Sequence, residues 1–465
     1  MSANLKPTAG LHLVRYGTAA DQKYLLGDLR GTYDQIIFNA NIVTHMPDAI
    51  ASFIGERAKK PYFIDPQTHA FQHNVSHLLS ASATRDGEIK RSVQRLLEQY
   101  GEPVERRVGE RRESVLPKDF NDANPRRAFC ERVLEFQIKA IEKRTQESDA
   151  AKYYKYLKGK GQAVGANLRP GLLVAPYFYM TSGTLSQWLA VNIACARDSE
   201  EYARNQNLPL AVQIVISRDL LEDRKLRPLV AEYENSRVRP AAFLIWVDSF
   251  SELTASEDEL RSFVKLLRQL GLLAPVVNLY GSFFSVALSR CELVKPLVGV
   301  CHGLEYGEDR GVLPVGGGIP VAKYYLPALH ARLRFREAEP AVRALGGLRS
   351  VSDFLDIICD CSECKRVIGT NPEADFAEYL MTRVKRSFQD GQIIEREYPL
   401  PETKEHCVRH YMWCKAREYG DAISRDLLVK ELRQTENKLS RVSGLQTVSH
   451  CGVWARVLGK KTSSA

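Results

Sequence analysis

Two apolar runs in the middle of the chain decide the fold: LAVQIVIS (210–217) and AAFLIWVDSF (241–250). Both are nearly continuous stretches of β-branched, aromatic and aliphatic residues, which is typical of strands covered on both faces, as in a parallel sheet. After the second run, EDELRSFVKLLRQLG (257–271) repeats leucine at helical spacing and ends at a glycine. This alternation predicts parallel strands joined by helical crossovers.

Six more runs of the same kind complete the pattern. They are HLVRYG (12–17), QIIFNANIV (35–43), PYFID (61–65), GLLVAPYFYM (171–180), PVVNLYGSFF (275–284) and PLVGVCHGL (296–304). Eight strands alternating with helices predict an α/β fold of the (β/α)8 TIM barrel type, with a doubly wound open sheet as the alternative. We assign the barrel to residues 1–345 and a C-terminal helical segment to 346–465.

The spacing of the runs predicts an insertion after the third strand. Residues 73–170 are helical in pattern and highly charged, which is also typical of a solvated helical face. Lys155, Lys158 and Lys160 lie there among tyrosines, and for them a nucleic-acid contact is as good an interpretation as a solvated face.

Composition excludes some classes of protein. The 465 residues are 44% hydrophobic and 26% charged, which excludes a mostly disordered chain. The net charge of +9 is a weak indication of a polyanionic partner. The chain opens without an apolar signal region, has no run long enough to span a membrane, and scatters most of its ten cysteines. We therefore expect a cytoplasmic protein with reduced thiols and no membrane contact.

One group of cysteines breaks that scatter. Cys359, Cys361 and Cys364 fall within six residues, and His406 and His410 follow downstream. Three thiolates at such spacing, with a distant histidine, are the ligands of a closed tetrahedral zinc site. The two histidines are spaced i, i+4 and share one helix face, so their pattern leaves the fourth ligand open. The prediction is a structural Zn²⁺ in a C-terminal helical subdomain.

This arrangement resembles the queuine/archaeosine tRNA-guanine transglycosylase superfamily, whose members are (β/α)8 barrels with a C-x-C-x-x-C…H zinc site after the eighth strand. The EHC of residues 405–407 is similar to that family's Glu-His-Asn, which favours His406 as the ligand. KPYFIDPQTHAFQ (60–72) resembles the third strand, where the family reads Asp-Ser-Gly-Gly-Phe-Gln. Asp65, Phe71 and Gln72 match that motif, with two extra residues between them.

The chain also departs from the family. WVDSFSE (246–252) stands where the family has paired glycines, and VGVCHGLEYGE (298–308) has no clear nucleophilic aspartate. It offers His302, Glu305 and Glu308 instead. Together with the DPxTxxF motif, this is most similar to the bacterial and phage branch that inserts 7-deazaguanines into DNA (the DpdA type).

The resemblance implies a DNA-guanine transglycosylase in DNA modification linked to restriction and defence. Such a glycosyltransferase exchanges guanine for a 7-deazaguanine base such as 7-cyano-7-deazaguanine (preQ0) by covalent double displacement. DNA and the deazaguanine would be its partners, beside other DNA-modification proteins. Two alternatives stay open: the same exchange on tRNA, and a non-catalytic nucleic-acid-binding subunit on this scaffold. The oligomeric state is also open, a homodimer being one option.

Base exchange requires a carboxylate nucleophile and an acid/base group. Asp65 and Asp248 each end an apolar run, which places them at the C-terminal mouth of a barrel. His302 is a further candidate for the proton or for the base. A turn-forming Asp-Pro, a strand-end aspartate and a core histidine are the structural alternatives. The resemblance implies substrate binding by Phe71 and Gln72, and we assign it also to Tyr177 and Tyr280, whose rings can stack on a flipped base, although packing of the barrel is the alternative.

Overall fold

The structure is a computed structural model. It describes residues 10–80, 86–147, 169–304, 308–313, 322–378, 382–389, 392–420, 423–443, 445 and 448–460. The lysines predicted to touch nucleic acid, Lys155, Lys158 and Lys160, lie outside the described residues, as does Glu305.

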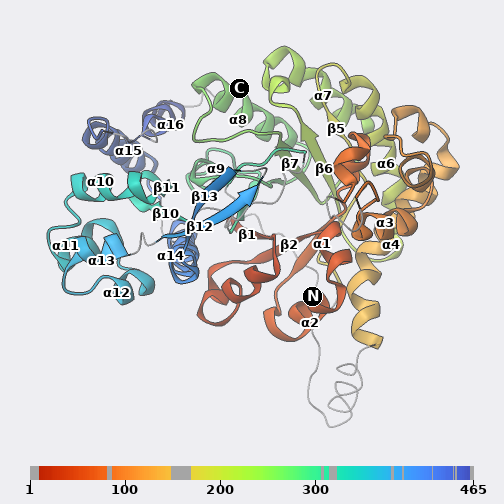
Figure 1. The fold of residues 1–465 in the computed structure, drawn as a ribbon. Helices are drawn as coiled ribbons and strands as arrows, with labels where there is room; N and C mark the ends of the chain where they lie inside the picture. Colours follow the sequence, from red (N-terminus) through yellow and green to blue (C-terminus); the bar gives the residue numbers. More distant parts are fainter. Residues whose placement is uncertain are drawn as a thin grey trace, which may run out of the picture.

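The apolar runs form a nearly closed parallel barrel (Figure 1). Its strands are β1 (Leu11–Tyr16), β2 (Gln35–Asn39), β3 (Tyr62–Asp65), β4 (Leu173–Val174), β5 (Tyr179–Met180), β6 (Leu210–Ile216), β7 (Ala242–Val247), β8 (Val276–Asn278) and β9 (Leu297–Gly303). Their order is β3-β2-β1-β9-β8-β7-β6-β4, and β5 also pairs with β6. Between β3 and β4, the Gly171 amide donates a 2.7 Å hydrogen bond to the Tyr62 carbonyl. The predicted barrel is confirmed, with the fourth run split into two short strands.

Alternation along each strand separates two cores. Leu13 and Cys301, which oppose each other on β1 and β9, belong to the cluster inside the barrel. Their neighbours Val14 and Val300 belong to the cluster between strands and helices. Because successive side chains of a strand point to opposite faces, each strand serves both cores, which explains why the runs are continuously apolar.

Helices cover the outside of this barrel (Figure 1). They are η1 (Ala19–Tyr24), η2 (Gly27–Thr32), α1 (Ala40–His45), α2 (Pro47–Ser52), η3 (Phe53–Ala58), α6 (Leu185–Asn205), η8 (Arg218–Leu221), α7 (Asp223–Ser236), α8 (Glu257–Gly271) and α9 (Phe283–Arg290). The start of α8 is fixed by a capping box, in which the Ser256 hydroxyl accepts from the Glu259 amide and the Glu259 carboxylate accepts from the Ser256 amide. The helix ends at Gly271, as its sequence predicts.

The insertion after β3 is helical, as predicted. After η4 (Thr68–Gln72) it contains η5 (Val75–Leu78), α3 (Arg91–Tyr100), η6 (Glu105–Glu110), η7 (Pro117–Phe120) and α4 (Ala123–Glu147). Gln137 is buried on α4, and its side-chain amide forms the pair of hydrogen bonds that the backbone of a neighbouring strand would form. Its Nε2 donates to the Val174 carbonyl and its Oε1 accepts from the Val174 amide, both at 2.8 Å. This fastens the insertion to β4.

The C-terminal region returns to the barrel. It contains β10 (Lys323–Leu326), η9 (Pro327–Leu329), β11 (Ala331–Arg334), α10 (Phe335–Leu345), α11 (Val351–Asp353), η10 (Phe354–Ile358), α12 (Ser362–Val367), α13 (Pro372–Glu378), β12 (Thr382–Gln389), β13 (Gln392–Pro399), α14 (Pro401–Gly420), α15 (Arg425–Leu439) and α16 (Ser449–Gly459). On α14, Tyr419 stacks on His12 of β1 at 4.7 Å. Helix α14 therefore belongs to the barrel's outer layer, although the sequence division placed it in a separate segment.

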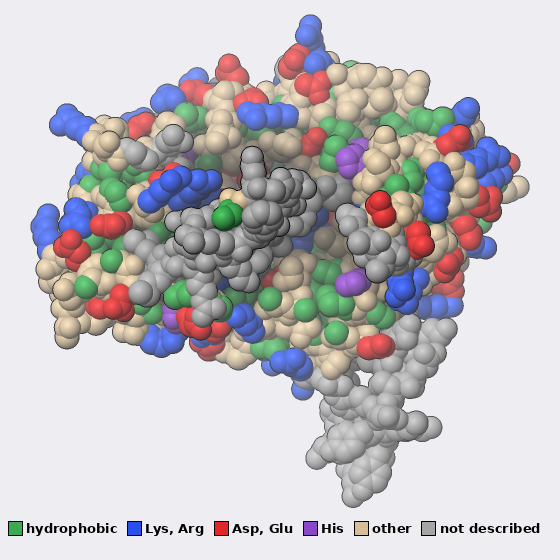
Figure 2. All heavy atoms as spheres, viewed as in Figure 1, with side chains coloured by type: hydrophobic (Ala, Val, Ile, Leu, Met, Phe, Trp, Pro, Cys, Tyr) green, Lys and Arg blue, Asp and Glu red, His purple; other side chains and the backbone are tan. Residues whose placement is uncertain are grey.

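On one face of the molecule, charged side chains of both signs lie side by side. On the face shown in Figure 2, basic side chains occur around the outline with acidic side chains among them. No described helix has the length and apolar character needed to cross a membrane.

Candidate metal centre and barrel mouth

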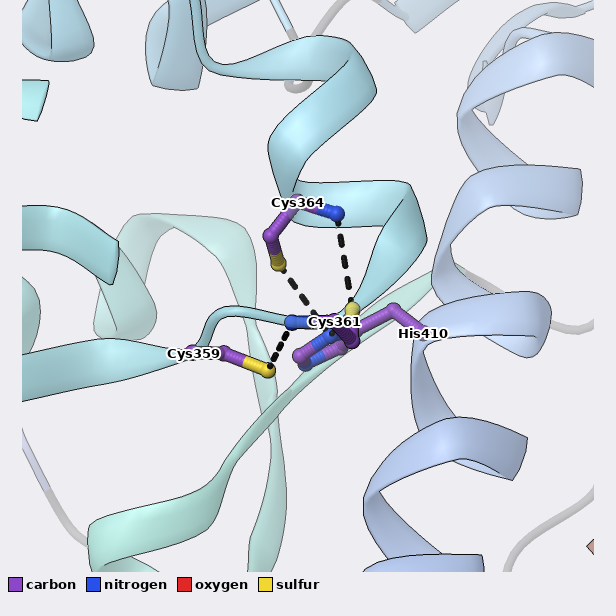
Figure 3. Close-up of side chains that lie close together, drawn as sticks. All are labelled: Cys359, Cys361, Cys364 and His410. Atoms are coloured by element: carbon purple, nitrogen blue, oxygen red, sulfur yellow. Dashed lines mark hydrogen bonds between the residues drawn. The ribbon is translucent and has the colours of Figure 1, made fainter. Parts of the chain in front are cut away.

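Four buried side chains converge in the C-terminal region (Figure 3). Cys359, Cys361 and Cys364 come from the loop before α12 and from its first turn, and His410 comes from α14. Their donor atoms all lie within 4.8 Å of one another. Three thiols and one imidazole fit a closed tetrahedral Zn²⁺ site, so these residues can hold the predicted metal.

The orientation of His410 identifies the atom that faces the cluster. Its Nδ1 lies 3.3 Å from the sulfurs of both Cys361 and Cys364. Its Nε2 lies 2.7 Å from the Tyr325 carbonyl of β10, and its ring stacks on Tyr324 at 4.5 Å. A carbonyl that accepts from the outer ring nitrogen is the usual support for a metal-binding histidine.

The family comparison favoured His406, and the structure corrects this. His406 Nδ1 lies 3.0 Å from the Glu363 carboxylate, at the edge of the cluster, and its side chain is 21% exposed. His410 sits one helical turn deeper and is fully buried. Sequence spacing alone could not distinguish two histidines on one helix face, because the choice of ligand depends on the position along α14 at which this helix packs against α12.

A fourth thiol near the cluster was missed in the sequence. Cys414 Sγ lies 3.8 Å from Cys359 Sγ and 3.7 Å from His410 Nδ1. It stands one helical turn after His410, so its i+4 spacing was the available signal. Cys414 is buried beside the four converging ligands as an additional thiol.

The second candidate site is the barrel mouth, where Asp65 is the last residue of β3. Its carboxylate is 1% exposed and accepts three hydrogen bonds. Oδ1 accepts from the Tyr177 hydroxyl at 2.6 Å and from the Gln67 amide at 3.1 Å, while Oδ2 pairs with Arg15 Nη1 at 3.1 Å. Arg15 Nη1 also donates to Asn39 Oδ1 at 2.6 Å. Asp65 is thus contacted by a hydroxyl, a backbone amide and a guanidinium from three separate parts of the chain.

The turn after Asp65 bears on both interpretations of the Asp-Pro pair, as a turn former and as part of a catalytic site. Gln67 has φ 53°, a left-handed conformation that is uncommon for a residue with a side chain. The Asp65 carboxylate, by accepting from the Gln67 amide, stabilises this turn. Asp65 is therefore a turn former, and it is also bound by an arginine and a tyrosine inside the barrel.

Residues 68–72 fasten this turn to the segment that carries β4 and β5. The Thr68 hydroxyl donates to the Tyr177 carbonyl at 2.6 Å and accepts from the Tyr177 amide at 2.9 Å. The Gln72 amide group does the same with the backbone of Tyr179, at 2.9 and 2.6 Å. Gln72, predicted to bind substrate, thus holds the Tyr179 backbone through its side-chain amide.

The second predicted carboxylate follows β7. Asp248 is partly exposed, and its Oδ2 accepts from the Tyr179 hydroxyl at 2.8 Å. Its Oδ1 accepts from the Val312 amide and from the Ser249 hydroxyl, both at 3.0 Å. Asp65 and Asp248 are thus bound by Tyr177 and Tyr179, two residues apart on one segment.

Aromatic rings surround the Asp65 end of the barrel. Trp246 lies 4.9 Å from Tyr280 and 5.1 Å from His69, and His69 stacks on Tyr177 at 5.3 Å. Arg15 lies over the Tyr280 ring at 4.6 Å. The structure brings Tyr177 and Tyr280 together with Asp65 as predicted, and adds His69, which the sequence analysis missed.

Several polar atoms inside the barrel have no hydrogen-bond partner among the described residues. They include Arg15 Nε and Nη2 and both amide atoms of Gln213. Gln213 is fully buried and lies between Ala211 and Val215, both of the inner cluster, so strand alternation directs it inward. Unpaired buried polar groups are rare, and a bound molecule or water commonly satisfies them.

Phe71 and His302, two of the predicted site residues, lie away from Asp65. Phe71 packs in the outer core, edge-on to Tyr100 at 6.1 Å. His302 follows the inward-facing Cys301, so alternation turns it to the outside of the barrel, where it bonds to the Gly281 carbonyl at 2.8 Å and the Tyr419 hydroxyl at 2.9 Å. Burial lowers the pKa of His302 well below its usual range. Neither side chain lies with Asp65, Tyr177 and Tyr280.

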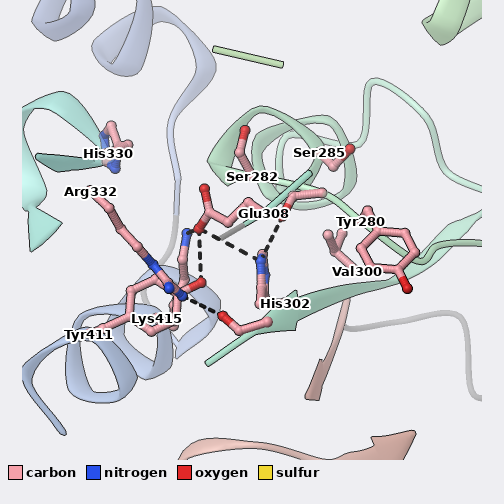
Figure 4. Close-up of polar contacts among 12 residues, drawn as sticks. Tyr280, Ser282, Ser285, Val300, His302, Glu308, His330, Arg332, Tyr411 and Lys415 are labelled. Atoms are coloured by element: carbon pink, nitrogen blue, oxygen red, sulfur yellow. Dashed lines mark hydrogen bonds and ion pairs between the residues drawn. The ribbon is translucent and has the colours of Figure 1, made fainter. Parts of the chain in front are cut away.

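Glu308 belongs to the same outer network (Figure 4). Its carboxylate accepts from the Tyr411 hydroxyl at 2.8 Å and pairs with Lys415 at 3.4 Å, both residues being on α14. Lys415 is fully buried and pairs also with Glu418 at 3.0 Å. Burial alone would raise the pKa of Glu418, but Lys415, His330 and Tyr325 together lower it to about 2. This charge network fastens α14 to the barrel.

Comparison with known proteins leaves the function open. No family model and no curated protein matches the chain. Among solved structures, the crystal structure of xylanase B from Clostridium stercorarium F9 matches at 10% identity and a TM-score of 0.27, over 67% of this chain and 88% of that one. A TM-score of 0.27 does not establish a relationship between the two proteins. The class that the molecule itself defines is a TIM-like barrel with a candidate Cys3His metal centre.

Proposed function

We propose that this protein is a DNA-guanine transglycosylase that replaces guanine in DNA by a 7-deazaguanine base. The observation that carries the proposal is the combination of a buried, arginine-paired Asp65 at the C-terminal end of a barrel strand with a Cys3His cluster formed between the α12 segment and helix α14. Both features agree with the motifs that the sequence shares with the transglycosylase superfamily. The zinc, when bound, supplies a structural cross-link between α12 and α14.

In the proposed reaction, a carboxylate attacks C1′ of the deoxyribose, and the bond from C1′ to guanine N9 breaks. The leaving guanine takes a proton from an acid, which leaves a covalent glycosyl–enzyme ester. The incoming deazaguanine then gives a proton to the same group and attacks C1′, and the carboxylate is released. This double displacement retains the configuration at C1′.

We assign the nucleophile to Asp248 and the acid/base group to Asp65. Asp248 is partly exposed, so a deoxyribose can approach it, whereas Asp65 is enclosed. Asp65 also accepts from the Tyr177 hydroxyl, whose oxygen lies 3.1 Å from His69 Nδ1. The unpaired donors of Arg15 and the rings of Trp246 and Tyr280 are available to bind a flipped base.

The choice of DNA over tRNA rests on the DPxTxxF form of the Asp65 motif. The test is release of labelled guanine from duplex DNA, single-stranded DNA and tRNA, each with 7-cyano-7-deazaguanine supplied. Exchange into DNA supports the proposal. Exchange into tRNA alone would overturn the substrate, and no exchange with any of the three would favour a non-catalytic nucleic-acid-binding subunit.

A further inference from the structure

Arg15, on β1, is buried in the barrel mouth, and only one end of its guanidinium has hydrogen-bond partners. Its Nη1 donates to Asn39 Oδ1 at 2.6 Å and to Asp65 Oδ2 at 3.1 Å. Its Nε and Nη2 have no partner among the described residues, although the side chain is only 5% exposed. Unpaired buried donors are rare, and each one costs free energy unless a ligand or a water molecule satisfies it.

The two unpaired nitrogens are neighbours on one edge of the guanidinium. Nε and Nη2 direct two nearly parallel N–H bonds from that edge, which is the fork that binds two acceptors of one planar molecule. The position of the fork is fixed, because Asn39 and Asp65 hold Nη1 and the Tyr280 ring covers the guanidinium at 4.6 Å. Arg15 therefore presents a preorganised pair of donors.

Strand β9, which pairs with β1, offers this fork no strong acceptor. Register places Gly303 beside Arg15, so no side chain stands at that position of β9. Cys301 also faces the barrel interior. Burial raises the pKa of its thiol to about 12, although its contact with Arg15 lowers it. The thiol is therefore neutral, and a neutral sulfur is only a weak acceptor.

From this geometry we propose that the Nε–Nη2 fork of Arg15 binds the O6 and N7 edge of guanine inside the barrel. Guanine carries two acceptors side by side on this edge, and an arginine fork is their commonest partner in specific recognition. A guanidinium stays charged at every working pH, so the fork remains a donor throughout. The inference rests on the proposed function for the identity of the ligand as guanine.

The same fork determines which replacement base the site accepts. In 7-deazaguanine a carbon replaces N7, so one donor of Arg15 stays unpaired. The nitrile of 7-cyano-7-deazaguanine restores an acceptor on this edge. An aminomethyl group at the same carbon carries an ammonium, which a buried guanidinium repels. The site therefore selects a base with an acceptor, and not a cation, at position 7.

Binding of free bases tests the fork without any exchange reaction. Equilibrium dialysis with tritiated bases should show that wild-type protein binds 7-deazaguanine about 5- to 150-fold more weakly than guanine, which is the discrimination that one bidentate contact provides. The 7-cyano base should bind more tightly than 7-deazaguanine, and the 7-aminomethyl base more weakly. Equal affinity for guanine and 7-deazaguanine, or no binding of guanine, would overturn the proposal and leave water as the partner of the fork.

The variant Arg15→Lys tests whether the preference belongs to the fork. Lysine keeps a positive charge beside Asn39 and Asp65 but has no pair of parallel donors, so guanine and 7-deazaguanine should bind with nearly equal affinity. Arg126→Lys, on α4, makes the same substitution at an arginine that pairs with Asp198 at 2.7 Å, and should keep the wild-type preference. A preference for guanine that survives in Arg15→Lys would overturn the assignment. If this variant does not fold, the comparison of bases on wild-type protein still decides.

The proposed function and the fork fail by different observations. Wild-type protein that binds guanine in preference to 7-deazaguanine but exchanges no base in DNA or tRNA would refute the transglycosylase and keep the fork. Exchange by a protein that binds guanine and 7-deazaguanine equally well would refute the fork and keep the transglycosylase.

Discussion

The Tyr179 hydroxyl donates a 2.8 Å hydrogen bond to Asp248, two residues along the chain from the Tyr177 hydroxyl that binds Asp65. One short segment, residues 177–179 leading into β5, therefore contacts both candidate catalytic carboxylates. The segment is itself fastened to the Asp65 turn by Thr68 and Gln72. Two carboxylates that lie 183 positions apart in numbering, 65 and 248, are thereby hydrogen-bonded to side chains of one short segment.

Substitution of Asp248 and substitution of Asp65 should block different steps of the proposed exchange. With Asp248→Asn, no covalent nucleic acid–protein adduct should form, because the nucleophile is lost. With Asp65→Asn, the adduct should form slowly and persist, since the acid/base group that completes the exchange is missing. Denaturing gels of protein incubated with labelled DNA measure the adduct. Asp258→Asn, an exposed residue in the first turn of α8, is the control and should turn over normally. An adduct that survives Asp248→Asn would reassign the nucleophile.

Metal content should follow the structural assignment of the ligands. Elemental analysis should find about one zinc per chain. His410→Ala should lose it, whereas His406→Ala, four residues away on the same helix, should retain it. Cys414→Ser should also retain zinc, because four ligands are complete without this thiol. Retention of zinc in His410→Ala would return the fourth ligand to His406.

Removal of the buried lysine should destabilise the fold strongly. Lys415→Met would leave the carboxylates of Glu308 and Glu418 buried without their cation. Breaking a buried ion pair on one side typically costs about 3–5 kcal/mol of unfolding free energy. Urea denaturation measures this loss. Lys430→Met, on the exposed face of α15, makes the same substitution without burial and should have little effect.

Stability should also depend on pH through His12. Burial lowers the pKa of His12 to about 3, from 6.5 in the unfolded chain. Between these values the unfolded state binds a proton that the folded state refuses, so the unfolding free energy falls as the pH drops below 6.5. The slope for one such group is about 1.4 kcal/mol per pH unit.

The measurement is a series of urea denaturations between pH 7.5 and 5. His12→Asn should flatten the dependence relative to wild type, and His45→Asn, at an exposed position on α1, should not. An unchanged slope in His12→Asn would show that His12 already carries a proton in the folded protein.

Local pattern was sufficient for most of the architecture. Each of the eight apolar runs contains a strand, because continuous apolarity over several residues requires burial on both faces. The three cysteine ligands and the strand-end aspartates were found for the same reason, since short spacings and strand ends are properties of neighbouring residues.

The partners of those residues emerged only in the folded barrel. Arg15 and Tyr177 meet Asp65 from positions 50 and 112 residues away in the sequence. The inward or outward direction of Cys301 and His302 depends on strand register, and the choice of His410 over His406 depends on how α14 packs against α12. Periodicity is a property of the chain, whereas the meeting of distant side chains depends on strand register and barrel closure. For that reason the sequence indicated the barrel and the thiols, and the fold alone revealed the hydrogen-bond partners of Asp65, the ligand histidine and the buried lysine.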